Sequence, residues 1–203
     1  MTSFVTGVAA GLAIAMPPGA IATLILQTGL QRGFRPAFAA GLGCATVDFL
    51  YASIAVFLGA ALVPVLGAAE PALRSAAGLA LVAIGVIGMF GLRRRTADAA
   101  IATTTTELLR TYLRFVALTM VNPATLAYFI AVALGLGREI LTDAPAFIAG
   151  VVLATGTWQS GLALVSGSLH GRLAPSTRGP ITVVANVVVI ALGLRILAQV
   201  FAS

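Results

Sequence analysis

The chain has 203 residues, of which 60% are hydrophobic and 9% are charged. Soluble domains are nearer half apolar and a quarter charged, so this composition excludes a soluble protein and indicates an integral membrane protein. The net charge of +6 comes from arginine alone, because the chain has no lysine. We attribute it to loops that face the cytoplasm and anionic lipid, not to nucleic-acid binding. The single cysteine, Cys44, excludes an internal disulfide and a cysteine-built metal site.

The apolar segments predict about six membrane spans, because each helical span needs roughly 20 apolar residues. In chain order we place them at about 3–28, 37–63, 72–92, 111–136, 145–168 and 180–201. In the first span, Gly7 and Gly11 form a GxxxG pattern that favours close approach of a neighbouring helix. Thr104 and Glu107 have the spacing of a capping box, which predicts a helix start near Thr105.

The arginines predict the orientation of these spans. The loops after the first, third and fifth spans carry nine of them: Arg32, Arg35, Arg93, Arg94, Arg95, Arg110, Arg114, Arg172 and Arg178. Only Arg74, Arg138 and Arg195 belong to the other side. Because positive loops stay in the cytoplasm, both termini are expected to be extracytoplasmic.

An internal repeat relates the two halves of the chain. Residues 36–41, PAFAAG, match residues 145–150, PAFIAG, at five of six positions and at an offset of 109 residues. Pro18 and Pro123 fall at nearly the same offset. Each half has three spans, so the second copy must be inverted, as in many transporters; chance similarity between apolar segments is the alternative. We therefore expect an all-α integral membrane protein, six transmembrane helices arranged as two inverted three-helix repeats, with helices 1 and 4 broken near mid-membrane. It forms a single transmembrane domain, 1–203, with repeat one at 1–92, a cytoplasmic connection at 93–110 and repeat two at 111–203.

Two proline-containing breaks, Pro17-Pro18-Gly19 and Asn122-Pro123, interrupt the first and fourth spans. Proline removes a backbone donor, and the freed polar groups must face protein or water. The half-helix that resumes after each break presents free N–H groups and a positive dipole end, which suit a carboxylate. The simpler alternative is a pair of ordinary proline kinks.

Asp48 is the only acidic residue deep in a predicted span. It lies about 16 Å along the second span at 1.5 Å per residue, where a charge costs at least roughly 2.5–3.5 kcal/mol. Two roles fit: binding a substrate ammonium group, and accepting and releasing a proton. A structural acid that is hydrogen-bonded or neutral is the alternative.

The fifth span carries a polar cluster at the depth of Asp48 that includes Thr157, its counterpart in the repeat, and Gln159. This cluster lines a cavity or joins helices. Asn122 is placed to cap the half-helix behind it. Gln27 lies near the membrane edge, and a lone loop histidine such as His170 is usually solvated. No catalytic set, metal-ligand cluster or phosphate loop is present, so the sequence supports neither an enzyme nor a cofactor.

These features resemble the lysine exporter superfamily of bacterial amino-acid exporters, which includes the threonine and homoserine exporters. The resemblance rests on Pro18-Gly19, on the glycines that lead to Asp48, on Asn122-Pro123, and on GLALVAIG and VVVIALG in the third and sixth spans. Ala124 stands where a lysine often follows Asn-Pro in that family. The resemblance implies export of amino acids or related small cations, driven by a proton or ion gradient.

The sequence therefore predicts an amino-acid exporter of the bacterial cytoplasmic membrane, working by proton-coupled alternating access. Its predicted substrate-binding residues are Pro18, Gly19, Asp48, Asn122, Pro123, Thr157 and Gln159. Asp48 is also the predicted proton-coupling residue, and Pro18, Asp48 and Pro123 are expected to lie close together. A divalent metal-cation exporter and a non-transporting membrane subunit are the alternatives. A small-molecule substrate and the lipid bilayer are the expected partners, and the sequence leaves homodimer formation open.

Overall fold

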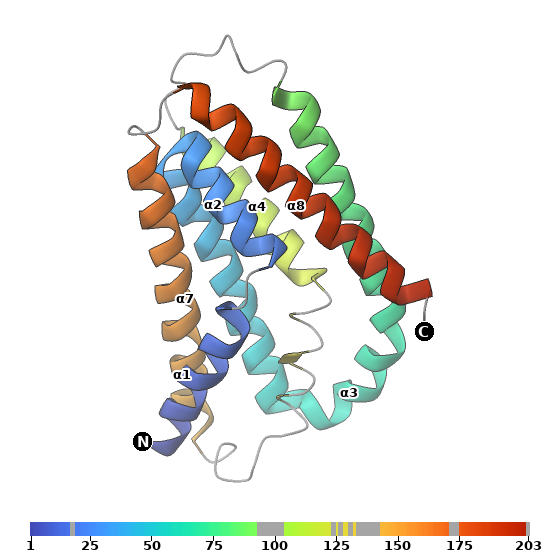
Figure 1. The fold of residues 1–203 in the computed structure, drawn as a ribbon. Coiled ribbons are helices and arrows are strands. Elements are labelled where there is room, and N and C mark those ends of the chain that lie inside the picture. The colour runs from blue at the N-terminus through green and yellow to red at the C-terminus, as the bar shows by residue number, and fades with distance from the viewer. Residues whose placement is uncertain are drawn as a thin grey trace.

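The protein is described by a computed structural model that covers residues 1–16, 19–92, 104–122, 125, 128, 129, 132, 143–170 and 175–201. These residues form helices and no strand, so the all-α fold class is confirmed (Figure 1). The helices are, in chain order, α1 (Thr2–Ala15), α2 (Ala20–Arg32), α3 (Phe34–Leu92), α4 (Thr105–Met120), α7 (Ala144–Leu169) and α8 (Pro175–Phe201).

The first predicted span consists of two helices that meet at an angle. α1 ends at Ala15 and α2 begins at Ala20, and the two axes differ by 75°. Gly19 stands at the start of α2 in an extended conformation, and no described side chain caps this helix end. The first span is therefore interrupted where the sequence predicts it, although Pro17 and Pro18 themselves lie outside the described residues.

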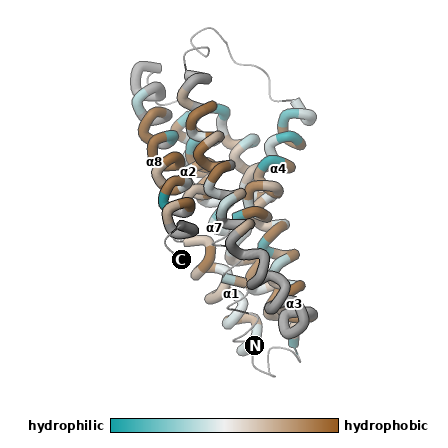
Figure 2. The backbone as a smooth tube through the Cα atoms, turned by 90° about the vertical axis from the view of Figure 1, so that its right-hand side faces the viewer, coloured by the Kyte–Doolittle hydropathy of each residue, from teal (hydrophilic) through white to brown (hydrophobic). Residues whose placement is uncertain are grey.

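Within the described residues, α7 and residues 34–57 of α3 are long and apolar enough to cross a membrane. The α1–α2 pair also meets this test if the two helices are taken as one bent span. Figure 2 shows apolar colouring along α2 and α8 and more hydrophilic colouring on the upper turns of α4. The chain is thus a membrane protein with several spans, while six spans in two inverted repeats stay a prediction.

α3 differs from the sequence-based expectation of two separate spans. Its backbone is helical without interruption from Phe34 to Leu92. Figure 1 shows it descending, bending at the lower end of the molecule and rising again, so it supplies two antiparallel segments. Pro64 and Pro71 fall in the intervening stretch. Proline removes one helical hydrogen bond and bends a helix, and here the bend occurs without a loop.

Two local predictions are confirmed. The Thr104 side chain accepts a hydrogen bond from the Glu107 N–H group at 3.3 Å, and α4 begins at Thr105 as the capping box predicts. Gly7 and Gly11 face α7: a Cβ atom on Gly7 would overlap the Phe147 carbonyl, and one on Gly11 would come within 2.7 Å of the Val151 carbonyl. Small residues therefore let α1 and α7 pack backbone to backbone.

Three helix contacts position the centre of the molecule. α1 packs on α7, α4 packs on the first part of α3, and α8 packs on the second part of α3. Glycines lie in each of these contacts, namely Gly7, Gly43 and Gly78. A buried apolar cluster that includes Leu24 and Ala40 fills the space between α2, α3, α4, α7 and α8.

Candidate substrate site around Asp48

Asp48 lies inside the helix bundle and not on its surface. Its side chain is only 4% exposed, within the part of α3 that is long and apolar enough to cross a membrane. A carboxyl group in such a position needs hydrogen-bond donors, because an unpaired charge in a membrane interior is costly. An interior position is expected both for a functional Asp48 and for a structural acid, so the function of Asp48 stays a prediction.

The donors come from α7. Thr155 and Gln159 turn their polar side chains toward the Asp48 carboxyl group. They are four residues apart and therefore lie on one face of that helix, and both are buried. The Thr155 hydroxyl finds no regular hydrogen-bond partner among the described residues. It is thus a buried donor beside the carboxyl group that remains available to a water molecule or a ligand.

Thr157 is not brought to Asp48. Two residues along an α-helix turn the side chain through about 200°, so Thr157 lies on the opposite face of α7 from Thr155 and Gln159, and it is exposed. Thr157 and Gln159 therefore lie on different sides of α7. Thr157 as a substrate-binding residue remains a prediction that this arrangement does not favour.

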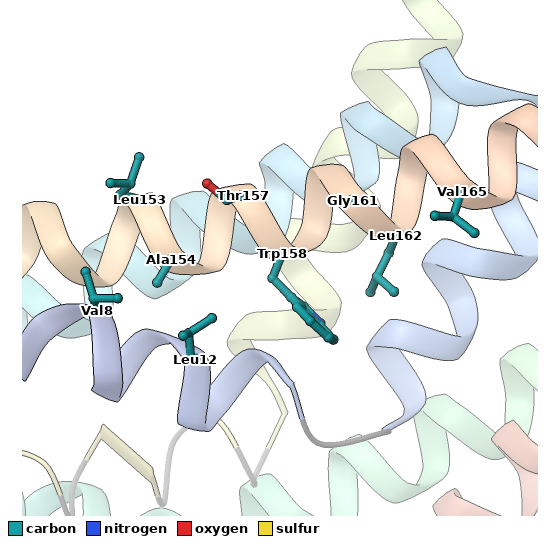
Figure 3. Close-up of a pocket in the computed structure, with 9 residues that line it drawn as sticks. All are labelled: Val8, Leu12, Leu153, Ala154, Thr157, Trp158, Gly161, Leu162 and Val165. Carbon is teal, nitrogen blue, oxygen red and sulfur yellow. The ribbon is translucent and has the colours of Figure 1, made fainter.

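Thr157 belongs to a separate apolar pocket of about 550 Å³ between α1 and α7. Figure 3 shows Leu12 of α1 facing the pocket from one side and Trp158 and Leu162 of α7 from the other. Its other lining residues are Val8, Leu153, Ala154, Gly161 and Val165. With so few polar atoms, this pocket does not suit a charged or zwitterionic ligand.

Of the two predicted half-helix starts, the structure describes the one at residues 19–21 and only part of the one at residues 123–125. The Gly19 carbonyl accepts hydrogen bonds from the N–H group and the hydroxyl of Thr23, at 3.1 and 2.9 Å, while the N–H groups of the first turn of α2 have no side-chain cap. Asn122 follows the end of α4, and its Nδ2 atom donates to the Thr125 hydroxyl at 3.0 Å. Pro18 and Pro123 lie outside the described residues, so their closeness to Asp48 stays a prediction.

Two contacts between helices gave no clear signal in the sequence. Cys44, one helical turn before Asp48, accepts a hydrogen bond from the Thr119 hydroxyl of α4 at 3.3 Å. Tyr128 donates to the Ala10 carbonyl of α1 at 2.6 Å. Such contacts join residues far apart in the chain, and only the packed fold can reveal them.

Among the described residues, no group of three or more His, Cys, Asp or Glu side chains gathers. The site combines one buried carboxyl group with neutral donors, which suits a monovalent amino compound better than a divalent metal ion.

Comparison with protein families decides the class of the chain. The LysE type translocator model matches residues 12–200. The chain belongs to the LysE type translocator family. Searches of curated proteins and of solved structures returned no match. Family membership confirms the resemblance inferred from the sequence, and it identifies a LysE-type membrane transporter in which Asp48 and its partners occupy the interior.

Proposed function

We propose that this LysE-type translocator exports amino acids or related small amino compounds by proton-coupled alternating access. The observation that carries the proposal is the Asp48 carboxyl group, buried within α3 and faced by Thr155 and Gln159 of α7. A buried carboxylate with neutral donors attracts an ammonium group and leaves the donors to orient it. LysE-type family membership supports export as the direction of transport.

The substrate carboxylate would meet the half-helix starts at Gly19–Ile21 and Pro123–Thr125. Gly19 has no side chain, and within the described residues α2 has no side-chain cap at this end, so the first-turn N–H groups are available to an anion. The ammonium group would then meet Asp48. A zwitterion thus needs two kinds of partner: the half-helix N–H groups would bind its carboxylate, and Asp48 would bind its ammonium group.

Asp48 would also couple transport to protons. In the empty site, a proton on the carboxyl group removes the cost of a buried charge. Entry of a proton from outside would neutralise Asp48 and release the ammonium group. Substrate and proton then compete for one carboxylate, which is the minimal chemistry of antiport.

We place the protein in the bacterial cytoplasmic membrane with both termini extracytoplasmic. The support is the arginine count, with nine arginines in loops on one side. In Figure 1 the α2–α3 junction, the start of α4 and the end of α7 lie at one end of the molecule, opposite the N-terminus.

A thermal-shift screen of the purified protein tests the substrate class. A ligand that binds the native state raises the unfolding temperature according to its concentration relative to its dissociation constant. We expect millimolar amino acids to stabilise the protein and divalent metal ions not to. Each stabilising amino acid should then exchange in proteoliposome counterflow. Stabilisation by divalent metals alone would favour a metal-cation exporter, and neither binding nor counterflow by any cargo would favour a non-transporting subunit.

A further inference from the structure

The C-terminal end of α2 is joined to the second half of the chain by polar contacts. Arg32 lies 3.7 Å from the Glu107 carboxylate, from Nη2 to Oε2, and its Nη1 atom donates to the Thr111 hydroxyl at 3.1 Å. Both partners lie on the first two turns of α4. The Thr111 hydroxyl donates in turn to the Glu107 carbonyl at 2.8 Å, which directs its lone pairs toward Arg32. The guanidinium group thus bridges two positions on α4.

A second contact joins α2 to α7. The Leu30 carbonyl, in the last turn of α2, accepts a hydrogen bond from Nδ1 of His170 at 2.8 Å. His170 is therefore a structural partner of α2 and not only a solvated loop residue. Nearby, Gly29 lies directly against the Ser166 side chain, so the two helices approach closely here.

A third contact lies deeper in the bundle. Gln27 donates from Nε2 to Oδ1 of Asn186 on α8 at 3.0 Å. Asn186 is 1% exposed, and its Nδ2 atom has no hydrogen-bond partner among the described residues. An unsatisfied donor in a membrane interior is unfavourable, so Asn186 stands to gain a water molecule whenever α2 separates from α8.

A glycine, Gly33, forms the junction between α2 and α3. Gly33 has φ +85° and ψ −175°, a backbone conformation that glycine adopts without the steric cost of a side chain. α2 is thus a short helix of 13 residues, with a break at one end and a glycine at the other. Its polar contacts with α4, α7 and α8 hold it against the second repeat.

We propose that Arg32, Glu107, Thr111, Leu30 and His170 form the cytoplasmic gate of the transporter, and that the Arg32–Glu107 pair controls its opening. The inference rests on the proposed function, because it assigns the regulation of access to the Asp48 site. Cargo for export enters from the cytoplasm, so α2 must leave α4 and α7 at this end before loading. The Arg32 and Glu107 side chains are 35% and 34% exposed, so water competes for the pair and the gate opens readily.

Along α3, Cys44 lies between the proposed gate end of the helix and Asp48. Cys44 is fully buried in the same apolar cluster as Leu24 and Ile25 of α2. Asp48 follows one helical turn later. Separation of α2 from the second repeat therefore exposes Cys44 first. Because Cys44 is the only cysteine in the chain, its reaction rate with a thiol reagent reports opening without any engineered label.

The test measures Cys44 labelling by a membrane-impermeant maleimide added to inside-out membrane vesicles. Arg32→Gln and Glu107→Gln each weaken the gate, and we expect each to raise the labelling rate about two- to fivefold, the population change that a partly exposed ion pair supports. The reversed pair Arg32→Glu/Glu107→Arg should restore at least half of the difference. Arg35→Gln is the matched control, because Arg35 is exposed at the same end and should leave the rate unchanged.

Three results overturn the proposal: unchanged labelling in both single variants, no recovery in the reversed pair, or a rise that occurs only in right-side-out vesicles. Cys44→Ser fixes the background, and a monodisperse elution profile in detergent shows that each variant is folded. The measurement uses no substrate. If labelling responds as expected but no amino acid is transported, the gate proposal is supported and the proposed cargo is wrong. If amino acids are transported but labelling does not respond, only the gate proposal is wrong.

Discussion

At the scale of single residues, the main finding is that Asp48 faces Thr155 and Gln159, which lie on one face of α7. Asp48 could be singled out as a candidate from the sequence because a lone acid among apolar residues is conspicuous in any sequence. Gln159 was predictable as a polar group at matching depth. Thr157 stays a predicted substrate-binding residue, although it lies on the other face of α7 from Thr155 and Gln159. The repeat offset aligns residues along the chain, whereas the face of a helix changes by about 100° per residue.

The distinction between the two faces of α7 gives a prediction. Gln159→Met removes a donor at Asp48 while keeping a similar volume, and we expect the KM of the exported amino acid to rise about tenfold, the usual effect of losing a hydrogen bond to a charged group. Thr157→Val is the matched control and should change KM less than about twofold, since surface changes are mild. Proteoliposome transport at several substrate concentrations measures both. A larger effect from Thr157→Val would assign the site to the opposite face.

At the scale of elements, short-range signals in the sequence predicted local structure well. The capping box gave the start of α4, and the proline-glycine break gave the interruption between α1 and α2. The uninterrupted helix of α3 was not predicted, because turn signals such as Pro64 and Pro71 indicate a bend but do not distinguish a bent helix from a loop. The contacts of Gln27 and His170 depend on tertiary packing, so the sequence near them carried no sign of either.

The contact between α1 and α7 gives a second prediction. A Cβ atom on Gly150 would overlap the Phe4 carbonyl of α1, whereas one on Gly156 meets nothing within 4 Å. Gly150→Ala should destabilise the protein by about 1–3 kcal/mol through overpacking, which lowers Tm by several degrees for a chain of this size. Gly156→Ala, on the same helix, should not lower Tm. Thermal unfolding in detergent measures both, and an equal loss in the two variants would show that the effect is not one of helix contact.

At the scale of the whole molecule, the helix contacts follow a repeated pattern. α1, the first half of the first span, packs on α7 through Gly7 and Phe147. α4, which opens the fourth span, packs on α3 through Tyr112 and Gly43 in the same way. Tyr112 follows Gly7 by 105 residues, close to the offset of the sequence repeat. Each half thus contributes a half-span helix that packs on a helix of the other half, and the inverted repeat itself stays a prediction.

Orientation supplies the third prediction. In a Cys44→Ser background, a cysteine in the arginine-rich connection (Ala97→Cys) should react with an impermeant maleimide only in inside-out vesicles. A cysteine at the end of the chain (Ser203→Cys) should react only in right-side-out vesicles. The reason is the excess of arginine in loops on one side, which retains them in the cytoplasm. The reverse labelling pattern would invert the molecule and move the proposed gate to the outer face.

The central claim is that Asp48 binds the substrate ammonium group and carries the coupling proton, and amino-acid counterflow with Asp48→Asn tests it most directly. Asparagine keeps the size of the side chain and removes both the charge and the titratable proton. We expect counterflow at subsaturating substrate and pH-driven flux each to fall by roughly tenfold or more, as expected when a charged partner is lost. Asp143→Asn, at an exposed acid with no side-chain capping bond, should transport normally. Counterflow and pH-driven flux in Asp48→Asn equal to those of the unmodified protein would contradict both roles of Asp48.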